Sequence, residues 1–343
     1  MTTRVHNPIS ARSPMNSRAI RTRLFTPVII GFSLLAAVCA TGVHIPDWVQ
    51  YVPFATSLVI LGLPHGAADH LVPAWLRSRR QSAASIMRVV ALYGVLAAAA
   101  LAMWVWAPAA AAIGFIALTW FHWGQGDLYV LRAVDNSDYL TGRRLRSAAV
   151  VIRGGLPMLV PLVFHPDVYR EFLVATVGLF DGSMSLDVLG GLGARATVCA
   201  VFVAVIVATG AITYRRAVDR SVWWRDQVEV GVLLFFFAAV PPILAIGLYF
   251  SMWHALRHFV RLDLIAGSPY VTTPKRIARM ARACAPTTAL AIVFLVMFAL
   301  VIPRAANSGV AALGLYLVLV SMLTVPHVAV VSYMDYRQRV WSG

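Results

Sequence analysis

Residues Ala196–Thr213 read ATVCAVFVAVIVATGAIT and contain no charged side chain. A helix needs about 20 apolar residues to cross the hydrocarbon core of a bilayer. Comparable runs occupy Pro27–Val43 and Val89–Ala107. The 343-residue chain is 60% hydrophobic and 13% charged, whereas soluble domains carry about 25% charged residues. The sequence therefore predicts a helical protein that crosses a membrane several times.

The apolar runs, read against the charged residues between them, predict an all-α polytopic transmembrane bundle of about ten spans, with eight or nine as alternatives. The pair Pro241-Pro242 decides part of this count, because paired prolines interrupt a helix and divide residues 228–266 into two crossings. The expected spans are residues 27–43, 51–71, 87–107, 109–131, 148–165, 196–213, 228–241, 243–262, 286–302 and 310–333.

Most of the 29 Lys and Arg residues fall in clusters that alternate with these runs, so that one side of the membrane receives nearly all of them. The positive-inside rule places that side, and with it both chain ends, in the cytoplasm. We therefore expect a multi-pass cell-membrane protein with one transmembrane domain at 27–335 and cytoplasmic tails at 1–26 and 336–343. The same distribution accounts for the net charge of +15 without a nucleic-acid partner. A signal or transit peptide is the alternative reading of the basic start; a retained tail is favoured because many spans follow.

Four histidine motifs lie within or at the ends of the apolar runs. A histidine there is costly unless its ring finds hydrogen-bond partners or a ligand. The four spans that carry the motifs are predicted to run in one direction, which brings the rings to a similar depth. This convergence favours a shared metal site over unrelated core histidines. The motifs are Pro64-His65-Gly66 with Asp69, His122-Trp123-Gly124 with Asp127, Trp253-His254 with Arg257-His258, and Pro326-His327 with Asp335.

Four of these histidines are the predicted metal ligands. His254 and His258 are four residues apart and project from one face of a helix, a spacing that offers two imidazoles to one ion. His65 and His122 complete the predicted set. His327 is a supporting candidate, either a ligand or a group beside the ligands. Imidazole suits Zn, Cu, Fe and Ni, so the spacing leaves the metal open.

Other side chains have predicted supporting roles. Asp69 lies one turn after His65 and is expected to accept a hydrogen bond from an imidazole N–H. Arg257 is embedded and must pair or reach the interface, and Asp127 is expected to meet arginines at the cytoplasmic interface. Seven aromatic residues surround the histidines, either as ordinary packing or as the lining of a pocket for a long apolar substrate. They are Trp120, Phe121, Trp123, Tyr249, Phe250, Trp253 and Phe259.

At these residues the sequence resembles the Brp/Blh family of membrane-bound β-carotene 15,15′-dioxygenases, which supply retinal to microbial rhodopsins. The matching motifs occur in the family's order and extend from the second expected span to the last. They are Pro64-His65-Gly66-x-x-Asp69, His122-Trp123-Gly124-x-x-Asp127, Trp253-His254-x-x-Arg257-His258 and Pro326-His327.

The resemblance implies a non-haem Fe(2+) held by His65, His122, His254 and His258, and fewer spans than ten. It further implies that the enzyme cleaves β-carotene, or a related carotenoid, at its central 15,15′ double bond with O2. The product would be retinal, with a rhodopsin-type protein as its recipient. Two other classes stay open: a haem-binding membrane protein that uses two of these histidines as axial ligands, and a proton-coupled transporter. A membrane di-iron desaturase would need more histidines than the chain has.

Overall fold

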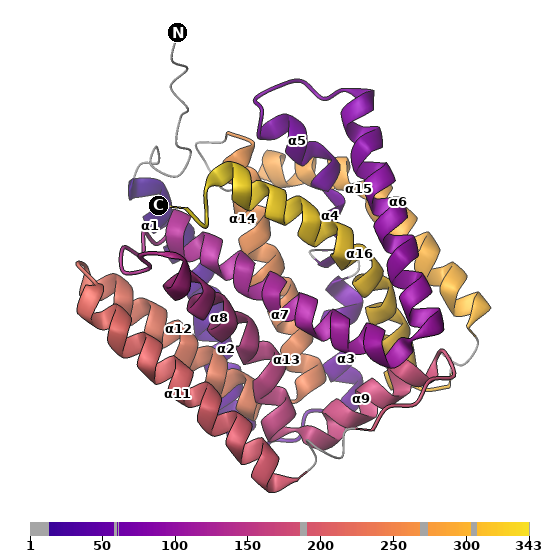
Figure 1. Cartoon of the computed structure of the whole chain (residues 1–343), viewed down its shortest axis with the longest axis horizontal. Coiled ribbons are helices and arrows are strands. Elements are labelled where there is room, and N and C mark those ends of the chain that lie inside the picture. The colour runs from indigo at the N-terminus through magenta and orange to yellow at the C-terminus, as the bar shows by residue number, and fades with distance from the viewer. Residues whose placement is uncertain are drawn as a thin grey trace.

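The computed structural model describes residues 14–57, 60, 62–185, 191–267, 274–302 and 307–342. The regular elements among these residues are all helices, and the described residues contain no strand (Figure 1). The predicted all-α class is confirmed. In chain order the α-helices are α1 (Pro14–Ile20), α2 (Thr26–Ala40), α3 (Asp47–Ser57), α4 (Gly62–Ala67), α5 (Val72–Trp75), α6 (Ala83–Trp106), α7 (Pro108–Ala133), α8 (Arg143–Phe164), α9 (Pro166–Gly178), α11 (Leu192–Arg216), α12 (Arg220–Ala239), α13 (Pro242–Leu248), α14 (Leu256–Ile265), α15 (Pro274–Val301) and α16 (Gly309–Gln338).

Six helical stretches among the described residues are long and apolar enough to cross a membrane. They are Ser17–Ala40, Ala83–Trp106, Arg143–Phe164, Leu192–Arg216, Arg282–Val301 and Gly309–Gln338. Each coincides with one of the ten expected spans, and the count of about ten is not confirmed. The other four expected spans, 51–71, 109–131, 228–241 and 243–262, are either broken or carry charged side chains within the helix.

The predicted interruption at Pro241-Pro242 is confirmed. Helix α12 ends at Ala239 and α13 begins at Pro242. Proline lacks the backbone N–H that would continue the α-helical hydrogen bonding, so two in succession end the helix. Beyond this point α13, a π-helical segment at Tyr249–Ala255 and α14 follow one another without a gap. This continuous run carries two of the predicted ligands.

Helices α7 and α16 lie between two outer groups, with α11 and α12 along one edge and α6 and α15 along the other (Figure 1). Small residues allow α7 and α8 to meet at backbone contact. A Cβ atom at Gly124 would clash with the backbone carbonyl of Val150, and one at Gly154 would clash with that of Trp120. Close approach through small residues is a common way to pack helices in membranes. This contact flanks His122, which lies between Trp120 and Gly124 on α7.

The first and last described helices meet at one end of the molecule. Ile20 and Phe25 share a buried cluster with Val134 and Val340. The Arg132 guanidinium, at the end of α7, donates a hydrogen bond to the backbone carbonyl of Ser342 at 3.1 Å. Both ends of the described chain therefore lie beside the C-terminal end of α7.

Candidate metal centre

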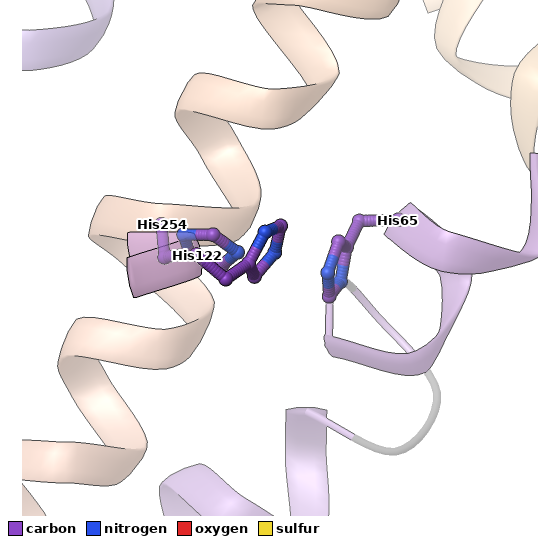
Figure 2. Close-up of side chains that lie close together, drawn as sticks. All are labelled: His65, His122 and His254. Atoms are coloured by element: carbon purple, nitrogen blue, oxygen red, sulfur yellow. The ribbon is translucent and has the colours of Figure 1, made fainter. Parts of the chain in front are cut away.

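Five buried imidazoles come together from five helical elements. His65 is on α4, His122 on α7, His254 on the π-helical segment, His258 on α14 and His327 on α16. The ring centroids of neighbouring members lie 4.7 to 5.5 Å apart. In Figure 2 the rings of His122 and His254 face that of His65. The four predicted ligands and the supporting candidate thus occupy one cluster.

The π-helical segment shapes one side of this cluster. Its widened turn stacks Phe250 against His254 with centroids 6.3 Å apart and stacks Tyr249 against Trp253 at 6.1 Å. The Phe250–His254 pair faces the other histidines, because the ring centroids of Phe250 and His65 lie 5.5 Å apart. Short π-helical turns inside α-helices are often found at functional sites. Here the turn separates the histidine face of the element from the face that Trp253 occupies.

Several imidazole nitrogens in the cluster have no hydrogen-bond partner. The Nε2 atoms of His122, His254, His258 and His327 are all buried and unpaired. An unpaired buried polar atom is costly, and the large majority of buried polar side-chain atoms in proteins have a partner. In His65, Nδ1 donates a hydrogen bond to the backbone carbonyl of Gly62. The lone pair of this ring is therefore on Nε2. A bound cation is a single partner that would satisfy these nitrogens together.

Two groups of donor atoms could hold a metal ion, each with its ligand atoms within 4.8 Å of one another. One group consists of His65, His122 and His254. The other consists of His258, His327 and the Asp69 carboxylate. Imidazole and carboxylate donors suit Fe, Zn, Cu, Ni and Mn. Because the two groups share a cluster of rings in contact, we treat them as one candidate centre.

Asp69 is buried in the cluster and accepts from an imidazole N–H, and the ring that donates is that of His327. Its Oδ2 accepts from Nδ1 of His327 at 2.7 Å and from the Tyr93 hydroxyl at 2.6 Å. The sequence placed Asp69 one turn after His65 on the same helix face, on the assumption of a continuous helix. Helix α4 ends at Ala67 and a 3-10 turn begins at Asp69, so the two side chains no longer share one α-helical face.

A second chain of polar contacts reaches His122. Its Nδ1 lies 3.4 Å from Oε1 of Gln125, and the Gln125 amide donates to Asp335 at 2.9 Å. Asp335 in turn pairs with Arg261 at 2.7 Å. Sequence reasoning missed Gln125, although its position three residues after His122 placed both on one helix face. Such outer partners orient a ligating ring.

Arg257, predicted to support the site, belongs to a buried ionic network beside it. Its guanidinium pairs with Asp127 at 3.3 Å and with Glu229 at 3.0 Å, and lies 3.8 Å over the Trp253 ring. Trp253 also donates its indole N–H to Asp127 at 3.1 Å. Asp127 does pair with arginines, as expected, and its side chain is buried within the protein. The network therefore packs behind the π-helical segment.

A cavity of about 680 Å³ opens beside the histidines, and four of the five form part of its wall: His65, His122, His254 and His327. The remaining wall comes mainly from α6, α7, α9, α15 and α16, and nearly all of it is apolar. On its open side the cavity includes exposed residues of two helices, among them Val90 and Gly94 on α6 and Leu290 and Phe294 on α15. The molecule thus offers a largely apolar space whose wall includes a cluster of imidazole nitrogens.

The predicted aromatic pocket is only partly the observed wall. Among the seven aromatics, Trp123 and Phe250 line the cavity. The Trp120 indole donates to the carbonyl of Val151 in the α7–α8 contact, and Phe121 is 38% exposed. The other three, Tyr249, Trp253 and Phe259, do not line the cavity either. The aromatic wall residues that the sequence did not single out are Phe54, Tyr93, Trp104, Phe115, Tyr169, Phe172, Phe294 and Phe298.

Comparison with known proteins gives consistent matches over most of the chain. The family described as beta-carotene 15,15′-dioxygenase matches residues 56–335. The probable beta-carotene 15,15′-dioxygenase Blh of Halobacterium salinarum is 37% identical over 338 residues, which cover 96% of this chain and 98% of that protein. The probable beta-carotene 15,15′-dioxygenase Brp of Halobacterium salinarum is 28% identical over 337 residues, covering 90% and 92%. The beta-carotene 15,15′-dioxygenase of uncultured marine bacterium 66A03 is 25% identical over 224 residues, covering 64% and 70%. No solved structure matches significantly.

Proposed function

The chain belongs to the β-carotene 15,15′-dioxygenase family, and we propose that it cleaves β-carotene, or a closely related carotenoid, at the central double bond with O2 to give retinal. One observation carries this proposal: unpaired Nε2 atoms of several buried histidines converge at the wall of a long apolar cavity. Such a cavity suits a hydrocarbon substrate, and the converging nitrogens suit a metal ion.

We propose Fe(2+) as the ion and His65, His122, His254 and His258 as its ligands. Nitrogen donors without thiolates suit non-haem iron, although they would also bind other divalent metals. When bound there, iron(II) supplies the redox chemistry that lets O2 react with a carbon–carbon double bond. The protein contributes donor atoms that are buried and already oriented, so little reorganisation is needed when the ion binds.

The cavity walls would position the polyene. Trp123 and Phe250 present aromatic faces near His254, with centroids 5.9 and 6.3 Å from its ring. A rod-like carotenoid is about as long as the ~30 Å hydrocarbon core of a bilayer. We propose that it enters from the lipid between α6 and α15, where the cavity lining includes exposed Gly94 and Phe294. The apolar wall then excludes water from the histidines.

The proposed setting follows from the apolar helices. Six candidate spans support a multi-pass protein of the cell membrane. A retinal product would leave into the same lipid phase, where a rhodopsin-type protein could bind it. No described side chain is required as an acid or base in this scheme.

Expression in carotene-producing cells tests the activity directly. Cells that express the enzyme should lose their colour and accumulate retinal, measured by liquid chromatography with mass spectrometry. His122→Ala and His258→Ala should abolish this conversion, whereas His44→Ala should not, because His44 is exposed and remote from the cluster. A Soret band in the purified protein, or unchanged carotene despite verified membrane expression, would overturn the assignment.

A further inference from the structure

His327 lies inside the ring cluster, within contact of three proposed ligands. Its ring centroid is 5.0 Å from that of His65, 4.8 Å from that of His122 and 4.9 Å from that of His258. The side chain is buried and also lines the cavity. A residue that only joined helices together would not need to occupy the space among these rings.

The hydrogen bonds of His327 define which nitrogen is available. Nδ1 donates to Oδ2 of Asp69 at 2.7 Å, which places the lone pair on Nε2. The Tyr93 hydroxyl donates to the same carboxylate oxygen at 2.6 Å and so holds the carboxylate in place. A carboxylate on the far nitrogen orients a histidine and raises its basicity as a ligand. Nε2 itself is buried and has no partner.

A purely structural role leaves part of this arrangement unexplained. The Asp69–His327 pair would join the α4 region to α16, but this contact satisfies only Nδ1. Nε2 would then be a buried, unpaired nitrogen that lowers the stability of the protein without any compensating interaction. We propose that His327 is a fifth imidazole ligand of the same metal ion, with Asp69 and Tyr93 as its positioning residues. This inference rests on the proposed metal centre and extends its ligand set.

The inference changes what the centre can accept. Four imidazoles on a six-coordinate ion leave two positions for other molecules, whereas five leave one. The Asp69 carboxylate also brings negative charge close to a set of otherwise neutral donors, which favours a divalent cation over a neutral ligand. The fifth donor, His327, lies on α16. The other four proposed ligands lie on α4, α7, the π-helical segment and α14.

Metal binding by the purified enzyme tests this inference without measuring turnover. Four proteins are titrated with Fe(2+) against a competing chelator, and Co(2+) is used to record their ligand-field spectra. They are the unmodified enzyme and the variants His327→Ala, Asp69→Asn and Tyr93→Phe. We expect His327→Ala to weaken metal affinity by at least tenfold and to alter the Co(2+) spectrum. Asp69→Asn keeps an acceptor oxygen but loses the charge, so a loss of about 10- to 100-fold follows from its role behind a ligand. Added imidazole should restore metal binding to His327→Ala but not to Asp69→Asn.

His165→Gln is the matched control. His165 is half-buried and its Nε2 contacts the carbonyl of Ala238 at 3.0 Å, away from the ring cluster. It should bind metal as the unmodified enzyme does. Unchanged affinity and an unchanged Co(2+) spectrum in His327→Ala would overturn the fifth ligand and leave the proposed function standing. Failure of the unmodified enzyme to bind any metal would overturn the proposed centre itself. If His327→Ala does not fold, Asp69→Asn decides, and wild-type affinity there counts against the inference.

Discussion

At the residue scale, Glu229 is the acceptor on which several buried cations converge. Its Oε1 pairs with Arg21 at 3.0 Å, and its Oε2 pairs with both Arg153 and Arg257 at 3.0 Å. The Glu229 side chain is 1% exposed. Removing one partner from a buried ionic pair leaves charge that neither water nor protein compensates. Loss of this carboxylate is therefore expected to destabilise the protein, even though Glu229 does not line the cavity.

Glu229→Gln keeps the shape of this side chain and removes its charge. We expect the free energy of unfolding to fall by about 3 to 5 kcal/mol, as for other broken buried pairs. The measurement is unfolding in detergent micelles followed by circular dichroism. Glu171→Gln is the control, because Glu171 is exposed, and it should change stability by less than about 0.5 kcal/mol. Equal effects of the two substitutions would contradict this account of the network.

Single-residue patterns identified which histidines to consider but not how they are paired. His65, His122, His254 and His258 stood out because an imidazole in apolar sequence needs a partner. Gln125 could have been found by the same helical spacing. Tyr93 could not, since it reaches Asp69 from α6, and nothing in the sequence relates the two. The pairing of Asp69 with His327 depends on where α4 ends, a boundary that hydrophobic periodicity does not mark.

At the element scale, the contacts along α7 and α16 show that these helices run in the same direction. Gln125 pairs with Asp335, and seven residues later along α7 Arg132 donates to the carbonyl of Arg339, four residues later along α16. The sequence predicted a shared direction for the histidine-bearing spans. The π-helical turn was not predicted, because it changes the backbone without changing the apolar pattern that sequence periodicity detects.

The position of His327 along α16 indicates how far the cavity extends from the histidine cluster. Both His327 and Leu313 line it, and Leu317 lies between them on the same wall. Ten residues of helix separate Leu317 from His327, a rise of about 15 Å. Half of a carotenoid whose full length is ~30 Å would extend about as far from a central bond held at the histidines. The far part of the cavity is therefore suited to one half of the substrate.

Leu317→Trp adds bulk in the far part of the cavity and tests this depth. We expect the substrate to stop short of its normal position, so that retinal formation falls by about 100-fold in kcat/KM, as for other small misplacements. Any remaining cleavage should be off-centre and give one aldehyde shorter and one longer than retinal, identified by mass spectrometry, with metal content unchanged. Ala312→Trp adds the same ring at an exposed position on α16 outside the cavity and should leave the products unaltered. Unchanged retinal formation by Leu317→Trp would contradict the proposed placement.

At the scale of the whole molecule, buried charge explains why hydropathy and structure give different counts of spans. Helix α7 carries His122, Gln125 and Asp127, and α12 carries Asp226 and Glu229. These polar side chains point into the protein and pair there. A count of apolar runs finds outer helices such as α11 well, because the charged residues of α11, Arg195, Arg215 and Arg216, lie near its two ends. It says less about inner helices, whose polar side chains are satisfied by tertiary contacts.

The arrangement of the chain ends predicts which surfaces share one side of the membrane. The N-terminal described helix and the end of α16 meet beside Arg132, at the C-terminal end of α7. Gly182 contacts Pro108, at the opposite end of the same helix. Helix α7 is 26 residues long, which corresponds to about 39 Å at 1.5 Å per residue. We therefore propose that both ends face the cytoplasm and that the turn after α9 faces the other side.

Cysteine labelling in intact cells and after lysis checks this arrangement. Ser17→Cys and Ser342→Cys should react with a membrane-impermeant maleimide only after lysis, whereas exposed Ser183→Cys should react in intact spheroplasts. The unmodified enzyme, with Cys39, Cys199 and Cys284, gives the background. Labelling of Ser17→Cys and Ser342→Cys from opposite sides would contradict the shared end of the fold. Labelling of both variants in intact cells would instead show the reverse orientation. That result would contradict the positive-inside argument but not the contacts around Arg132.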